Sequence, residues 1–159
     1  MTARPSAGIL LFRRTAAGLE VLLGHPGGPY WHRKDDGAWG IPKGEFEAHE
    51  GDDAYAVARR EFREETGHDA PNAAGAPIAL GTIVKRSGKV VTAWAMEGDL
   101  DAATAVSNTF PMEWPPGSGV MIDVPEFDRL AWFGADAARR KMRGAEAPFL
   151  ERLVDALSR

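Results

Sequence analysis

Three glutamates lie close together in the stretch RREFREETG, at positions 61, 64 and 65. On a helix with about 100° per residue, Glu61, Glu64 and Glu65 share one face. Glu61 and Glu65 repel each other at the i,i+4 spacing, and Glu64 and Glu65 lie where the helix dipole disfavours negative charge. A divalent cation would relieve both penalties, and carboxylate oxygens suit Mg²⁺ or Mn²⁺. The spacing therefore indicates a metal site.

The alternative interpretation is a solvent-exposed helical face with ion pairs, which is what most charge runs are. Arg60 and Glu64 have the spacing of such a pair. The preceding segment GIPKGE, residues 40–45, favours the metal site, because its glycines let backbone approach a ligand and Lys43 can bind a phosphate oxygen. By itself that segment is more often an ordinary Pro/Gly turn. The combination predicts a site for a metal and a phosphate.

Carboxylates and histidines are the only strong metal ligands in the chain, because it has no cysteine. This absence excludes disulfides and a cysteine nucleophile, and it is compatible with the cytoplasm, which is the expected location. The net charge of −4 gives no general attraction to nucleic acid or anionic membranes. The apolar run in MTARPSAGILLFRR is too short for a signal peptide or a membrane span. We expect neither nucleic acid nor membrane as a partner.

The acidic residues need a helix to hold them, and the hydrophobic pattern predicts one from Asp52 to Thr66. Asp52 or Asp53 is a suitable N-cap, and Gly67 is placed to end the helix. The apolar stripe that packs on a sheet comprises Tyr55, Ala58 and Phe62. This stripe lies beside the acidic face, so one flank of the helix is buried and the next carries the carboxylates.

The rest of the chain predicts a mixed sheet and two C-terminal helices. Hairpins are expected at 6–14 with 19–25 and within 77–100, a last strand at 129–133, and helices at 134–142 and 147–159. Residues 26–45 and 107–127 have loop-like sequences, apart from a brief strand near 39–41, and long loops are often functional. The prediction is one domain over 1–159, α/β or α+β in class.

The charged helix and its preceding loop resemble the Nudix box, G-x5-E-x7-R-E-U-x-E-E-x-G-U, in which U is a bulky apolar residue. The C-terminal half matches at Arg60, Glu61, Phe62, Glu64, Glu65 and Gly67. The segment WGIPKGE and the expected strand order are also typical of the family. The chain is thus similar to the Nudix (MutT-like) hydrolases, and the resemblance implies an α/β/α sandwich with a central catalytic helix.

The first half of the box departs from the family pattern. Asp52 has the family's spacing to Arg60, but seven residues rather than five separate it from Gly44. Glu50 has the right spacing from Gly44, but nine residues separate it from Arg60. A two-residue insertion explains either count, so both candidates for the first acid stay open. His68 also stands where the family has an apolar residue.

The resemblance implies roles for the matching residues. Glu61, Glu64 and Glu65 would bind Mg²⁺ or Mn²⁺ with the backbone carbonyl of Gly44, the surest ligands being Glu64 and Glu65. Arg60 would orient a neighbouring glutamate. The implied reaction is hydrolysis of a diphosphate bond in a nucleoside diphosphate linked to another moiety. In it the cation neutralises the diphosphate and a carboxylate accepts the proton of the attacking water.

Some functional positions are open at the level of sequence. Many family members use a further acid from a later loop, and Glu113 is the first candidate for it, with Glu126 second. Candidates for phosphate contacts are Lys43, His32, Arg33 and Lys34, and candidates for contact with a base are Tyr30, Trp31 and Trp114. For each of these aromatic residues, packing under a long loop is the more common role.

The expected substrate is a small molecule with a diphosphate, either a nucleoside triphosphate or a dinucleoside polyphosphate. The family subgroup that these loops resemble is bacterial and has no assigned substrate. The alternative function is a non-catalytic nucleotide-binding or regulatory module on the same scaffold, because a fold does not fix a function. Nudix proteins are often dimers, so a homodimer is a further expectation.

Overall fold

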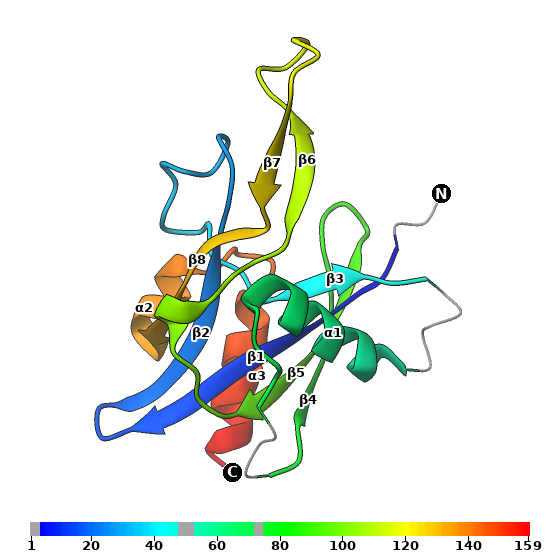
Figure 1. Cartoon of the computed structure of the whole chain (residues 1–159). Coiled ribbons are helices and arrows are strands. Elements are labelled where there is room, and N and C mark those ends of the chain that lie inside the picture. The colour runs from blue at the N-terminus through cyan, green and yellow to red at the C-terminus, as the bar shows by residue number, and fades with distance from the viewer. Residues whose placement is uncertain (1–3, 48–52, 72–74) are drawn as a thin grey trace.

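The computed structural model describes residues 4–47, 53–71 and 75–159 of the chain. Its centre is a mixed six-stranded sheet of order β4-β5-β1-β2-β8, with β3 also paired to β1 (Figure 1). Only β1 and β5 run parallel, whereas the other neighbours in this sheet are antiparallel. The strands are β1 (Ser6–Thr15), β2 (Gly18–Pro26), β3 (Lys43–Glu45), β4 (Ile78–Val84), β5 (Val90–Glu97) and β8 (Phe127–Gly134).

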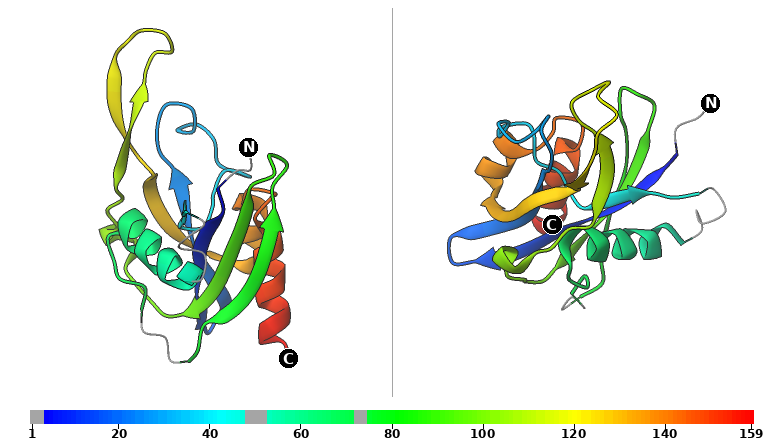
Figure 2. Two further views of the ribbon diagram at one scale, coloured as in Figure 1. Left: turned by 90° about the vertical axis from the view of Figure 1, so that its right-hand side faces the viewer. Right: turned by 45° about the horizontal axis from the view of Figure 1, so that its top comes forward.

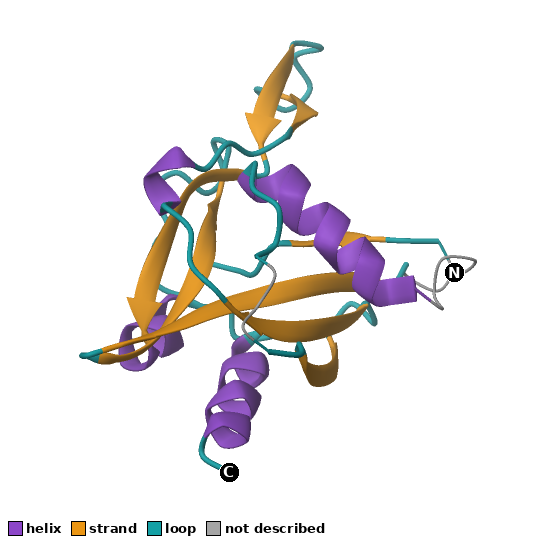
Figure 3. Ribbon diagram, turned by 60° about the horizontal axis from the view of Figure 1, so that its bottom comes forward, coloured by secondary structure: helices purple, strands orange, loops and turns teal. Residues whose placement is uncertain are grey.

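Strand β1 is central because its side chains are apolar on both faces. Ile9 and Leu11 join the apolar cluster beneath helix α1 (Ala54–Thr66), whereas Leu10 and Phe12 join the cluster on the opposite face. Alternate side chains of a strand point to opposite faces, so a continuous apolar run demands cover on both. The result is the expected α/β/α sandwich, with α1 on one side of the sheet and α3 on the other (Figures 2 and 3).

Helix α1 packs on the sheet through the predicted stripe. Ala58 and Phe62 are fully buried, while Tyr55 is half-buried. Gly67 adopts a left-handed conformation, with φ of 75°, and its N–H donates to the carbonyl of Arg63 at 2.8 Å, so it ends the helix as predicted. Of the N-cap candidates, Asp53 precedes the helix without a side-chain capping bond.

Both candidates for the first acid of the box, Glu50 and Asp52, lie outside the described residues. Their assignment therefore stays a prediction.

The C-terminal segment covers the other face of the sheet with two predicted helices, α2 (Ala135–Lys141) and α3 (Ala147–Leu157). Phe149, Leu150 and Leu153 of α3 are completely buried in the second apolar cluster. A short 3-10 helix, η2 (Ala102–Thr104), lies between β5 and the next strand. In the described part of the chain, no helix has the length and apolar character needed to cross a membrane.

The prediction of a loop at 107–127 is wrong. Strands β6 (Thr109–Glu113) and β7 (Met121–Pro125) form an antiparallel hairpin that projects from the body (Figure 1). Most of its side chains are half-buried or exposed, and each strand contains a proline, which strand sequences usually avoid. The brief strand expected at 39–41 is reduced to isolated bridges at Trp39 and Gly40, and a regular strand, β3, begins at Lys43.

Candidate functional site

A cavity of about 440 Å³ lies where α1, β3 and the segment after β2 meet the base of the β6–β7 hairpin. Its lining combines three kinds of side chain. The acidic residues are Glu45, Glu61, Glu65 and Glu126; the basic ones are Lys43, Lys89 and Arg143; the large apolar ones are Trp31, Phe110, Met112 and Phe127. A cavity with both charges and an apolar part can hold a ligand that combines a phosphate group with a flat ring.

Gly44 and Glu61 make the closest approach between backbone and carboxylate in this cavity. A Cβ at position 44 would lie 2.1 Å from Cδ of Glu61, so any residue but glycine would displace this carboxylate. Arg60 Nη2 lies 3.6 Å from Oε1 of the same carboxylate, which agrees with an orienting role. Burial raises the pKa of Glu61 to about 6, and the neighbouring charge of Glu64 adds to this rise while Arg60 opposes it.

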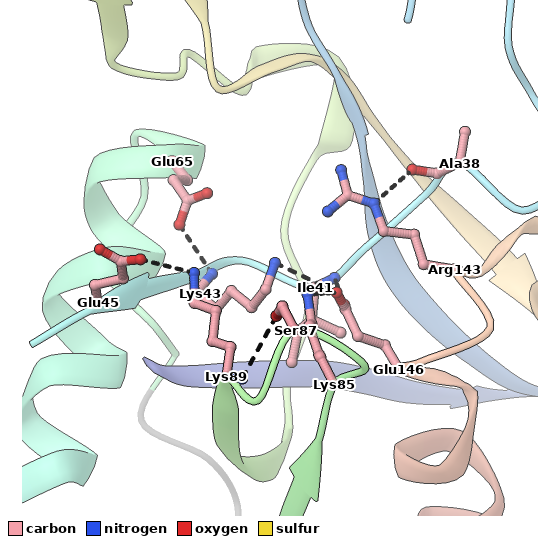
Figure 4. Close-up of polar contacts among 10 residues, drawn as sticks. All are labelled: Ala38, Ile41, Lys43, Glu45, Glu65, Lys85, Ser87, Lys89, Arg143 and Glu146. Atoms are coloured by element: carbon pink, nitrogen blue, oxygen red, sulfur yellow. Dashed lines mark hydrogen bonds and ion pairs between the residues drawn. The ribbon is translucent and has the colours of Figure 1, made fainter. Parts of the chain in front are cut away.

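Glu65 is the most buried carboxylate on α1, with 5% of its surface exposed. Its Oε2 accepts the backbone N–H of Lys43 at 2.8 Å (Figure 4). Burial raises its pKa well above the ordinary value; Lys43 opposes this rise, while the charges of Glu126 and Glu61 add to it. Two carboxylates thus disfavour the charge of a third, Glu65, inside one cavity.

Glu64 occupies a different position from its two neighbours. Its side chain is exposed and is not part of the cavity lining. The predicted shared face therefore divides, with Glu61 and Glu65 facing the cavity and Glu64 facing solvent. Its backbone carbonyl accepts the N–H of Asn108 at 2.8 Å, which ties α1 to the segment leading into β6.

The donors in the cavity suit a hard divalent cation. They are carboxylate oxygens, which Mg²⁺ and Mn²⁺ prefer, and a cation would offset both the burial that raises the pKa values of Glu61 and Glu65 and the neighbouring negative charges that add to the rise. The backbone of Gly44 lies directly against the carboxylate of Glu61, in a space that any side chain would fill. The side chains line one wall without converging, and across the described ranges no three acidic or histidine side chains are grouped as metal ligands.

Lys43 connects this acidic wall to a second buried carboxylate, Glu146. Oε2 of Glu146 lies 3.3 Å from the ammonium of Lys43 and 3.4 Å from that of Lys85. Oε1 accepts the backbone N–H of Ile41 at 3.0 Å (Figure 4). Glu146 is fully buried. Burial alone would raise its pKa, but Lys43, the Ile41 N–H, Lys85 and Arg143 bring it below the ordinary value.

The two candidate acids outside α1 occupy different places, one in the cavity and one away from it. Glu126, the second candidate, lines the cavity and its charge acts on Glu65. Glu113, the first candidate, lies at the end of β6 away from that lining, and its Oε1 accepts the N–H of Gly117 at 2.6 Å. Glu113 therefore stabilises the turn of the hairpin in this structure, while Glu126 has the position of a site residue.

The aromatic candidates divide in the same way. Trp31 lines the cavity, while Tyr30 and Trp114 contact each other edge to face at 5.1 Å and lie outside the lining. This pair joins the segment after β2 to the hairpin. His32, Arg33 and Lys34 are exposed outside the lining, and Lys34 stacks on the Trp31 ring at 4.8 Å. Only Trp31 of these residues is placed to contact a ligand in the cavity.

Three lining residues, Arg143, Lys89 and Ser6, have no signal in the sequence that marks them as site residues. Arg143 follows α2, and Lys89 precedes β5 and pairs with Glu45 at 2.9 Å. Ser6 begins β1, and its hydroxyl is the one buried side-chain oxygen or nitrogen without a hydrogen-bond partner in the described chain. Only the folded sheet brings these residues to the cavity.

Comparison with known proteins identifies the family and the fold. The family model for the NUDIX domain matches residues 2–153. The structure is similar to an Ap4A hydrolase from C. elegans in a binary complex, with a TM-score of 0.63 and 20% identity over 96% of this chain and 98% of that chain. It is also similar to the NUDIX domain of Shewanella oneidensis NrtR complexed with ADP ribose, with a TM-score of 0.64 and 16% identity over 99% and 90% of the respective chains.

A third similar structure is RenU, a Nudix hydrolase from M. smegmatis, with a TM-score of 0.56 and 21% identity over 99% of this chain and 88% of that chain. At these identities, the three structures show a shared fold. The chain has no match among curated protein sequences.

Proposed function

The chain belongs to the NUDIX domain family, and we propose that it is an enzyme that hydrolyses a diphosphate bond in a nucleoside diphosphate linked to another moiety. The observation that carries the proposal is the placement of Glu61, Glu65 and Glu126 in one cavity with Lys43 and Gly44. Acidic side chains buried close to one another in a cavity lower the stability of the fold. Groups that are kept at such a cost mark functional sites.

We assign the metal site to Glu61, Glu65 and the backbone carbonyl of Gly44, with Glu64 at its solvent edge. The bound Mg²⁺ or Mn²⁺ supplies neutralisation of the charge on the diphosphate. Lys43, which lines the same cavity as these carboxylates, binds a phosphate oxygen. Its backbone N–H holds Glu65 at 2.8 Å, so the residue that binds substrate also positions a metal ligand.

We assign the general base to Glu126 rather than Glu113. Glu126 lies in the cavity beside Glu65, where its carboxylate can accept a proton from the attacking water. The reaction needs no covalent intermediate, so positioning and charge stabilisation are sufficient. Phe110 offers flat apolar surface in the same cavity, on which a base can stack.

A nucleotide substrate is supported by the similar structures, because one is an Ap4A hydrolase and another holds ADP ribose. The test is to incubate the protein with nucleoside triphosphates, diadenosine polyphosphates and ADP-ribose, with Mg²⁺, Mn²⁺ or EDTA. We expect metal-dependent cleavage of at least one of them. The alternative, a non-catalytic nucleotide-binding module, would instead give thermal stabilisation by a nucleotide that is never cleaved.

A further inference from the structure

Arg143 lines the cavity and is held in a fixed orientation. Its Nε donates to the carbonyl of Ala38 at 3.1 Å, and its backbone N–H donates to the carbonyl of Trp39 at 2.8 Å. Its guanidinium carbon lies 5.1 Å from the centre of the Trp31 ring, which is the range of a cation–π contact. Figure 4 shows the two terminal nitrogens turned away from Ala38. These nitrogens are the pair with which arginine binds the two oxygens of one phosphate.

None of the carboxylates that the structure describes neutralises Arg143. Its nearest buried acid, Glu146, is already shared between the Ile41 N–H on one oxygen and the ammonium groups of Lys43 and Lys85 on the other. Within the described residues, no carboxylate forms an ion pair with the guanidinium. One buried negative charge therefore faces three positive ones at this end of the cavity.

The pKa of Lys85 is further evidence that positive charges are crowded at this end of the cavity. Burial lowers the pKa of its ammonium group, and the charges of Lys43 and Arg143 lower it further, although Glu146 opposes them. A region whose own cations disfavour one another is stabilised when an anion enters. Of the other cations of the lining, Lys89 is paired with Glu45 at 2.9 Å and Lys43 with Glu146 at 3.3 Å, whereas Arg143 has no ion pair among the described residues.

We propose that Arg143 binds a phosphate group beyond the diphosphate that is hydrolysed, and that it gives the site a preference for linear chains of three or more phosphates. The inference rests on the proposed function, in which the diphosphate lies between the α1 carboxylates and Lys43. Arg143 comes from the segment between α2 and α3, and the loop of Ile41 and Lys43 separates it from Glu65 (Figure 4). A chain of three or more phosphates supplies one group for Arg143 besides the two that lie between the α1 carboxylates and Lys43.

The first test measures binding of inorganic tripolyphosphate to the metal-free protein by titration calorimetry. We compare the wild type, Arg143→Gln, and the control Arg140→Gln, which removes an exposed arginine of α2 outside the cavity. Arg143→Gln should weaken binding at least tenfold, since it removes a charged bidentate donor, and Arg140→Gln should change it less than twofold. A wild type that does not bind, or equal affinities of wild type and Arg143→Gln, would overturn the proposal.

The second test separates chain length from general binding. For Arg143→Gln we expect KM for ATP to rise at least tenfold, while KM for ADP-ribose, which has only two phosphates, changes less than threefold. Arg143→Lys should give an intermediate KM for ATP, because it keeps the charge and loses the fork. Equal rises for both substrates would refute the chain-length preference. If neither substrate is cleaved by the wild type, the proposed hydrolysis fails in this form, whereas the tripolyphosphate titration still decides the role of Arg143.

Discussion

Replacing Glu61 by glutamine should stabilise the metal-free protein while it destroys the site. Burial raises the pKa of Glu61 to about 6 from an ordinary value of 4.5. That difference corresponds to about 2 kcal/mol of stability lost when the folded protein must hold the charged form. The folded state binds the proton more tightly than the unfolded state, so the penalty is absent below pH 4.5 and complete above pH 6. Glutamine mimics the protonated form and never incurs it.

Urea denaturation of both proteins in EDTA, from pH 4.5 to pH 8, measures this difference directly. Glu61→Gln should be more stable by up to about 2 kcal/mol at pH 8, and the gain should vanish toward pH 4.5. The control Glu151→Gln breaks an exposed ion pair between Glu151 of α3 and Arg139 of α2. It should lower the free energy of unfolding by less than about 1 kcal/mol at any pH. A Glu61→Gln protein that is less stable than wild type at pH 8 would refute the reasoning.

Three further predictions concern the site and its support. Gly44→Ala should lower kcat at least tenfold with an unchanged circular dichroism spectrum, since the new Cβ would meet the Glu61 carboxyl group at 2.1 Å. Glu146→Gln should lower the free energy of unfolding by about 2–4 kcal/mol in urea denaturation at pH 7, because two ammonium groups lose their partner. The pKa of Glu146 in the folded protein lies below 4.5, so this loss should persist down to that pH and fade only below it. Phe62→Ala should lose about 3–5 kcal/mol, because its ring is fully buried beneath α1.

The acidic helix could be predicted because its information is local. Residues three and four apart share a helix face, so the spacing of Glu61 and Glu65 predicted their common side before any fold was known. The same rule put Glu64 with them; its side chain is exposed in the structure, although its charge still acts on Glu61. Spacing predicts a face about 100° wide, but packing decides which part of it is buried.

Glu146 and Arg143 could not be predicted because their partners are distant in the sequence. Glu146 receives the N–H of Ile41 across 105 residues, and Arg143 reaches the carbonyl of Ala38 across 105. Each residue alone has the sequence context of a surface charge near a helix end. The β6–β7 hairpin was missed because its strands are only five residues long and each contains a proline, which strand sequences usually avoid.

The most direct test of the account compares hydrolysis by Glu65→Gln, Glu126→Gln and Glu113→Gln under saturating Mg²⁺. Glu65 and Glu126 line the cavity, and Glu113 is engaged by Gly117 in the hairpin. We predict that the first two substitutions lower kcat at least a hundredfold, and that Glu113→Gln stays within threefold of wild type. Wild-type kcat in Glu65→Gln, or a loss in Glu113→Gln as large as in the other two, would contradict the assignment of the cavity as the site of hydrolysis.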